Sequence, residues 1–193
     1  MTIKFRPIRL GLLCLTAFAI AAPALAQELP NLREARRLVF AEDGAVEGEV
    51  ILHDSLSETD VAILNQLVQT QAYYAAIAIA PEMGLASEAT IAAANYHDEA
   101  NARTAALAAC NEARTSGPAC VVVLVIRPEG WEPGRPLQLS TDATAALRGD
   151  FRRLGRNRVM AISETTGQWG IGSDLTEALA ACGETDCRAV IDG

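Results

Sequence analysis

The pentapeptide ALAAC occurs twice in this chain, at residues 106–110 and again at residues 178–182. A second cysteine follows each copy, Cys120 in the first case and Cys187 in the second. Each of these cysteines opens an apolar run, CVVVLVI and CRAVI. The pattern predicts a helix that a disulfide joins to the strand after it, and it predicts this arrangement twice.

The segments that precede the two helices also correspond. AIAPEMG at residues 78–84 matches AISETTG at residues 161–167, and each reads as a strand that ends in a turn. In both copies a helix precedes this strand and a short return strand follows the turn. We therefore predict an α+β fold, a duplicated α-β-β-α-β unit with a mostly antiparallel sheet, helices packed to one side of it, and disulfide staples.

The chain divides into four parts on this interpretation. Residues 1–26 form a signal peptide, and residues 27–126 form the first, larger copy with an N-terminal lead. Residues 127–136 contain three prolines and two glycines, which is typical of a linker. Residues 137–193 form the second, trimmed copy. Because each copy is small, we expect the two to pack as one domain around one core.

The helix of the second copy has a specific place in that expectation. Ser140 caps it, Gly155 ends it, and it carries apolar residues at helical spacing. Residues 121–126 are apolar on both faces and need cover from both sides. We expect the second-copy helix to supply part of that cover through Leu147, Phe151 and Leu154.

The N-terminal segment predicts export. Three basic residues precede an apolar core at residues 10–20, and the small residues Ala24 and Ala26 fit cleavage after Ala26. A membrane anchor is the alternative, but the core is shorter than the roughly 20 residues that a span needs. Cys14 would leave with the signal. We expect a periplasmic or secreted protein.

The charge of the remaining chain limits its partners. Residues 27–193 contain 13 arginines, no lysine and 24 acidic residues, a net charge of −11. Such a chain repels phosphate backbones and anionic headgroups, so we expect neither nucleic acid nor a membrane as partner. Four cysteines remain after cleavage, which in an exported chain favours disulfides. Since each copy holds its own pair, we predict Cys110–Cys120 and Cys182–Cys187.

With both helix ends in view, the chain resembles a family of small exported proteobacterial proteins known as a domain of unknown function. In that family a strand hairpin precedes an alanine-rich helix that ends in cysteine, and a second cysteine begins the next strand. The resemblance covers about residues 73–126 and 158–193. It implies an exported disulfide-stapled domain, and it implies no established activity.

Some relatives of this appearance carry the label 5-aminolevulinate synthase, and the residues argue against that activity. A pyridoxal-phosphate enzyme needs a lysine for its Schiff base. The only lysine is Lys4, which lies inside the signal. We expect no cofactor.

The two histidines, His53 and His97, are the candidates for chemistry or metal binding. Each precedes an aspartate, which makes an acid–base pair conceivable. No third ligand is spaced to complete a metal site. We expect both histidines to lie at the surface or at strand ends. Substitution of either by alanine should then leave stability and partner binding nearly intact.

Two tryptophans are candidates for ligand contact. Trp131 lies in the linker, where an exposed side chain favours recognition. Trp169 belongs to GQWGIG at residues 167–172, whose glycines suggest either a phosphate cradle or a return strand with close backbone approach. The second interpretation fits the preceding turn better. No nucleophile elbow and no P-loop occurs in the chain.

Two functions remain open from the sequence. The first is a non-enzymatic module that binds a protein or envelope component, since the framework is robust and no reactive constellation is apparent. The second is a small periplasmic enzyme that uses a histidine and a neighbouring carboxylate. The second requires a histidine in a concave pocket, within hydrogen-bond reach of another polar side chain.

Overall fold

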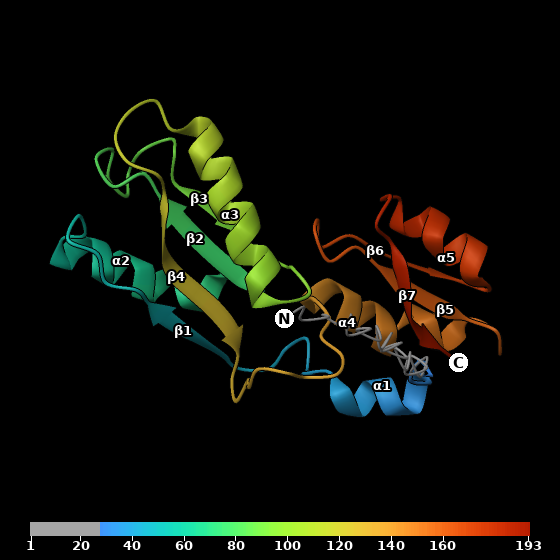
Figure 1. Ribbon diagram of the computed structural model, residues 1–193. Helices are drawn as coiled ribbons and strands as arrows, with labels where there is room; N and C mark the ends of the chain where they lie inside the picture. The colour runs from blue at the N-terminus through green and yellow to red at the C-terminus, as the bar shows by residue number, and fades with distance from the viewer. Residues whose placement is uncertain (1–27) are drawn as a thin grey trace, which may run out of the picture.

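A computed structural model describes residues 28–193, and the predicted signal peptide, with Cys14 and the cleavage site after Ala26, lies outside these residues. The described chain forms two antiparallel sheets, which Figure 1 shows as two bodies side by side. In chain order the elements are α1 (Leu32–Leu38), β1 (Val46–Val50), α2 (Glu58–Leu67), the 3-10 helix η1 (Val68–Thr70), β2 (Ala75–Ile79), β3 (Ile91–Ala93), α3 (Glu99–Ala113), β4 (Val121–Pro128), α4 (Thr141–Arg148), the 3-10 helix η2 (Asp150–Arg153), β5 (Val159–Ile162), β6 (Trp169–Gly172), α5 (Leu175–Cys182) and β7 (Arg188–Asp192).

The first sheet has four strands in the order β1-β4-β2-β3, and all neighbours are antiparallel. Its central strand β2 (AAIAI) is buried along its whole length. The second sheet has three antiparallel strands in the order β6-β5-β7, and β5 (VMAI) is likewise wholly buried. The predicted α+β class with antiparallel sheets is confirmed.

Helices cover both faces of the first sheet, so the expectation of helices on one side is wrong. On one face, Leu64 of α2 packs with Ile77 and Leu124. On the other face, alanines of α3, among them Ala106, pack with alanines of β2 such as Ala78. The reason is the strand composition: a strand that is apolar on both faces needs cover from both sides, and alanine lets α3 approach closely.

The second sheet is also covered on both faces. Ala178 of α5 packs against Ala161 on one side, while α4 and α1 lie on the other. Figure 1 shows α5 and α4 on opposite sides of the strands. Asn31 caps the N-terminus of α1, since its side chain accepts the N–H groups of Arg33 and Glu34, and α1 buries Ala35 in the cluster that α4 forms.

α4, the helix predicted after Ser140, differs from its prediction in two ways. It ends at Arg148, because Gly149 breaks it, and η2 continues the path with Phe151. Its apolar face, with Leu147, packs on Met160 of its own sheet and does not cover β4. The four clusters of buried side chains therefore each lie against one sheet, and the apolar core is not shared between the halves.

Candidate functional site

The two disulfides join each cysteine-ended helix to the strand after it. Cys110, in the last turns of α3, is bonded to Cys120 with the Cα atoms 6.1 Å apart, and Cys182 of α5 is bonded to Cys187 with the Cα atoms 6.2 Å apart. Both predicted pairings are confirmed. All four cysteines of residues 28–193 are thus paired, which assigns them to the framework.

We call the first sheet with α2 and α3 the first half, and the second sheet with α1, α4 and α5 the second half. The two halves meet at the N-terminus of α4. Three consecutive N–H groups there have no partner inside the helix, as at any helix start. Each is accepted by a group of the first half: Ser140 donates to Nδ1 of His97 at 3.0 Å, Thr141 to the carbonyl of Tyr73 at 3.4 Å, and Asp142 to the side chain of Asn95 at 3.1 Å. The first half therefore completes the cap of a helix in the second.

His97 is the centre of this junction. Its side chain is buried, with 1% of the residue exposed. Nδ1 accepts the N–H of Ser140, so the ring proton is on Nε2, and Nε2 donates to the carbonyl of Gln168 at 3.1 Å. Both ring nitrogens are bound to backbone groups of the second half. The imidazole therefore bridges the two halves in one defined tautomer.

Burial favours the neutral form of this histidine. Desolvation lowers the pKa of His97 below its ordinary value, against smaller opposing effects of the Gln168 carbonyl and of the carboxylates of Asp98 and Glu164. A second proton, on Nδ1, would also point at the N–H of Ser140, which is a donor and cannot accept it. The expectation that His97 lies at the surface is wrong, because its two polar atoms satisfy backbone groups from distant parts of the chain.

His53 lies in a different environment. It is exposed, and its Nδ1 accepts the N–H of Ser55 at 3.1 Å and lies 2.9 Å from the hydroxyl of the same residue. These contacts are confined to one turn after β1. The structure thus does not bring His53 and His97 together, and no group of three or more metal-ligating side chains occurs among residues 28–193.

A cavity of about 620 Å³ opens beside the junction. We call it the junction cavity. It lies among α1, residues 135–138 of the linker end, the start of α3 and the strands β5 and β7. Its floor is apolar and is formed by the buried side chains of Leu137, Ile162 and Val190.

Charged groups form the walls of the junction cavity, and most already have partners. Arg188 pairs with Glu164, and Asp98 caps α3 by accepting the N–H of Asn101 at 2.8 Å. Arg135 donates to the carbonyl of Leu38 at 2.5 Å and lies 4.2 Å over the ring of Phe40. The walls are therefore of mixed sign, which together with the apolar floor suits a ligand with both apolar and polar parts.

The glycines of the β6 hairpin serve helix packing. A Cβ added to Gly170 would lie 2.2 Å from the backbone nitrogen of Cys182, and one added to Gly172 would lie 2.4 Å from that of Ala178. Only glycine allows α5 to lie this close to the strand. The alternative of a phosphate cradle therefore loses its support, since the space beside these glycines is filled by the helix.

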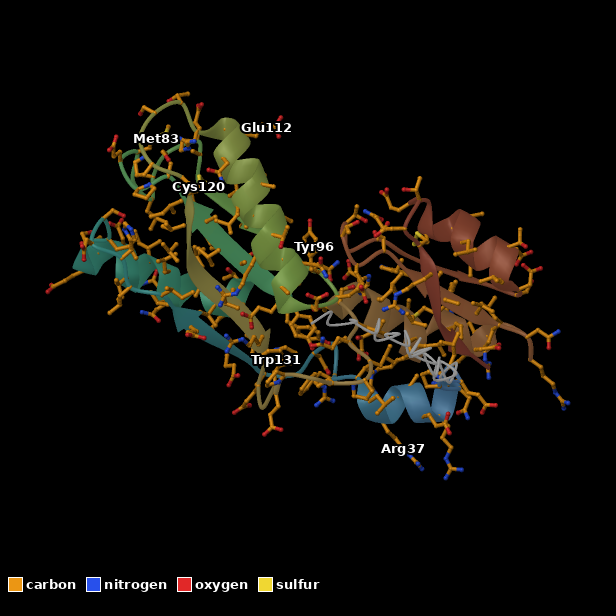
Figure 2. The ribbon with its side chains drawn as sticks, viewed as in Figure 1. Arg37, Met83, Tyr96, Glu112, Cys120 and Trp131 are labelled. Atoms are coloured by element: carbon orange, nitrogen blue, oxygen red, sulfur yellow. A yellow bond between two sulfur atoms is a disulfide. The ribbon has the colours of Figure 1, made fainter. Side chains whose placement is uncertain are left out.

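The two tryptophans are held by the protein itself. Trp169 packs against the apolar cluster beneath the second sheet. Trp131 is half-buried, donates from Nε1 to Gln138 at 2.7 Å and lies 5.0 Å from the guanidinium of Arg127. Figure 2 shows it where the linker leaves β4, while Tyr96 lies at the junction between the two bodies. Neither tryptophan lines the junction cavity.

Sequence reasoning missed the junction cavity. Its lining comes from five separate segments, and no motif in any of them indicates the others. The available signal was His97 itself, a polar residue that directly follows a strand hairpin.

The comparisons with known proteins give no match: no family model, no curated protein and no solved structure is similar to this chain. Within residues 28–193, no helix has the length and apolar character that crossing a bilayer requires. The function must therefore be argued from the geometry alone.

Proposed function

We propose that this chain is an exported, disulfide-stapled, non-enzymatic module that binds a segment of an envelope protein in the junction cavity. The observation that carries the proposal is the cavity itself, with its apolar floor and charged walls. Its volume falls within the range of about 300–1,000 Å³ that is typical of ligand sites. Two disulfides and the signal-like N-terminus support export.

The histidine enzyme is the weaker hypothesis. His97 does line the junction cavity, which was one requirement. A general base, however, needs a ring nitrogen that can reach a substrate proton. Both nitrogens of His97 are bound to backbone groups of Ser140 and Gln168. The residue therefore supports the wall of the cavity and positions the two halves.

A peptide segment fits the cavity because of its mixed character. Apolar side chains would contact Leu137 and Val190, while the polar backbone would meet the charged walls. Leu29 also lines the cavity, and 40% of its surface is exposed. An exposed leucine beside an apolar floor extends the surface available to a partner.

The experiment compares two leucines of similar exposure. Leu29 lines the junction cavity, and Leu175 lies on α5 with 49% exposed and takes no part in the cavity lining. The mature chain, Leu29→Glu and Leu175→Glu are each used to capture partners from periplasmic extract. We expect one protein that the wild type and Leu175→Glu retain and that Leu29→Glu loses by at least about tenfold, about 1.4 kcal/mol. Equal retention by both variants contradicts the proposal.

We also propose that the two halves arose by duplication and that the chain belongs with the exported family it resembles. The support is topological. In each half the central strand pairs with its return strand on one side and with the post-disulfide strand on the other. A register irregularity interrupts the second pairing in both, between Ile77 and Ala78 and between Met160 and Ala161.

A further inference from the structure

The arginines of this acidic chain are concentrated at one end of the second body. Seven of the 13 arginines in residues 27–193 lie in two short segments, REARR at residues 33–37 and RRLGRNR at residues 152–158, which contain one acidic residue between them. The two segments are far apart in sequence. α1 carries the first, and η2 with the loop before β5 carries the second.

The fold brings these segments around one hollow. A depression of about 480 Å³ is lined by Asn31, Leu32, Arg33, Arg36, Arg158 and Gly193, and we call it the arginine hollow. α1 separates it from the junction cavity, because Glu34, Arg37 and Leu38 line the other site. The arginine hollow is thus a second concave site with a different chemistry.

Arg158 is fixed in position for recognition. Its Nη1 donates to the carbonyls of Arg152 and Leu154, both at 3.3 Å, and its guanidinium lies 5.5 Å from the ring of Phe151. Its Nε is buried and has no hydrogen-bond partner in the described structure. A guanidinium that is held by its surroundings loses little conformational entropy when it binds a further acceptor.

No ion pair within residues 28–193 engages the arginines of the hollow. Among residues 28–193, Arg33, Arg36 and Arg158 have no carboxylate within 4.0 Å, whereas Arg153 nearby pairs with Asp150 at 2.7 Å. Three like charges around one depression repel each other, and an anion bound between them would offset this repulsion because it attracts all three. A tetrahedral dianion offers several oxygens, which matches guanidinium forks that approach from different sides.

We propose that the arginine hollow binds the phosphate group of a phosphate-bearing ligand. Arg33 and Arg36 contact it from α1, and Arg158 contacts it from the opposite wall. Inorganic phosphate and a phosphate-monoester lipid headgroup share this chemistry. The net charge of −11 led us to expect no membrane partner, and the hollow is a local exception, because it gathers three arginines of an otherwise acidic chain. The proposal is independent of the junction cavity, since no residue lines both sites.

The test titrates the ¹⁵N-labelled mature chain with inorganic phosphate at constant ionic strength, with acetate as the comparison anion. Arg36→Gln removes one exposed charge from the hollow, and Arg153→Gln removes the same charge nearby, outside it. We expect saturable shifts around residues 31–36 and 158 with phosphate. Arg36→Gln is expected to raise the Kd about tenfold or more, and Arg153→Gln to leave it within about twofold. Because Arg36 is exposed, its substitution does not threaten the fold.

A second arm identifies the source of the phosphate. Sedimentation with phosphatidylcholine vesicles, with and without phosphatidic acid, shows whether the same arginines bind a headgroup. Phosphatidic-acid-dependent binding that Arg36→Gln loses and Arg153→Gln keeps supports the proposal with lipid as the source. Phosphate binding without vesicle binding supports it with a soluble ligand. Equal effects of the two substitutions, equal binding of acetate, or no binding in either arm overturn it.

Discussion

His97 accepts the backbone N–H of Ser140 at 3.0 Å, although 43 residues separate the two in sequence. The imidazole thereby takes part in capping a helix in the other half of the molecule. Helix caps are usually supplied by neighbouring side chains such as Ser, Thr, Asp or Asn. Here the hydroxyl of Ser140 accepts the N–H of Ala143 at 3.2 Å, which is the usual local cap, and His97 accepts the N–H of Ser140 itself. This bond couples the formation of α4 to the folded first half.

Substitution of His97 is therefore expected to destabilise the protein, in place of the nearly neutral effect that we expected from the sequence. His97→Ala removes two hydrogen bonds: it leaves the N–H of the buried Ser140 without an acceptor, and it leaves the carbonyl of Gln168 with the N–H of Ser163 alone. We expect a loss of about 2–4 kcal/mol in the free energy of unfolding, measured by urea denaturation. His53→Ala is the control and should change it by less than about 0.5 kcal/mol, since His53 is exposed. Equal stability of the two variants would contradict the bridging role.

The same histidine predicts how stability depends on pH. Burial lowers the pKa of His97 in the folded state, so the unfolded chain takes up the proton at higher pH than the native protein. The free energy of unfolding should fall as the pH drops below about 6.5, the ordinary histidine value, and level off below the lowered native pKa. His97→Gln should lack this component. Urea titrations at several pH values between about 8 and 5 measure it, and parallel profiles for both proteins would disprove it.

The glycines of β6 give a steric prediction. Gly170→Ala places a methyl group against the backbone of Cys182, where neither strand nor helix has room to move. We expect a loss of about 1–3 kcal/mol, with a lower melting temperature. Gly155→Ala is the matched control, because a Cβ there meets nothing within 4 Å. It should be neutral or slightly stabilising, by up to about 1 kcal/mol. A larger effect at Gly155 than at Gly170 would refute close helix packing.

The disulfides should contribute unequally. In the chain-entropy model, the bond between Cys110 and Cys120 closes the longer loop and stabilises by about 3 kcal/mol, while the bond between Cys182 and Cys187 contributes about 2 kcal/mol. The double variants Cys110→Ser/Cys120→Ser and Cys182→Ser/Cys187→Ser test this by thermal unfolding. Peptide mapping without reduction checks the pairing in the native protein, and a peptide that links Cys110 to Cys182 would show the assignment to be wrong.

Local patterns were enough to predict most of the framework. The ALAAC helix ends, the cysteines after them and the apolar runs lie within short windows, so the disulfides and most strands could be placed from sequence. The end of the second-copy helix was less certain: Gly149 ends α4 before Gly155 is reached. This difference depends on backbone geometry that several adjacent residues could adopt.

The candidate site could not be predicted in the same way. His97 binds backbone groups, which have no signature in the side-chain pattern, and its partners are 43 and 71 residues away. The cover of β2 and β4 depended on which helix packs against which sheet, and apolar periodicity does not choose the partner. The sequence assigned part of this cover to the helix that became α4, and α2 lies against β4 in its place.

The last prediction concerns cooperativity between the halves. Their apolar clusters are separate, so hydrophobic burial alone would permit independent unfolding. The junction opposes this, because the first N–H groups of α4 lose their acceptors when the first half unfolds. The second sheet also needs α1 and its C-cap Val39. Ala35 of α1 and Val39 are buried in the cluster of the second sheet, although they precede the strands of the first sheet in sequence. We therefore expect residues 27–193 to melt in one transition. Residues 137–193 alone, even when oxidised, lack both the external cap and α1, and should give a poorly dispersed ¹H–¹⁵N spectrum. A well-dispersed spectrum of that fragment, or two separate transitions in the full chain, would show that the junction does not couple the halves.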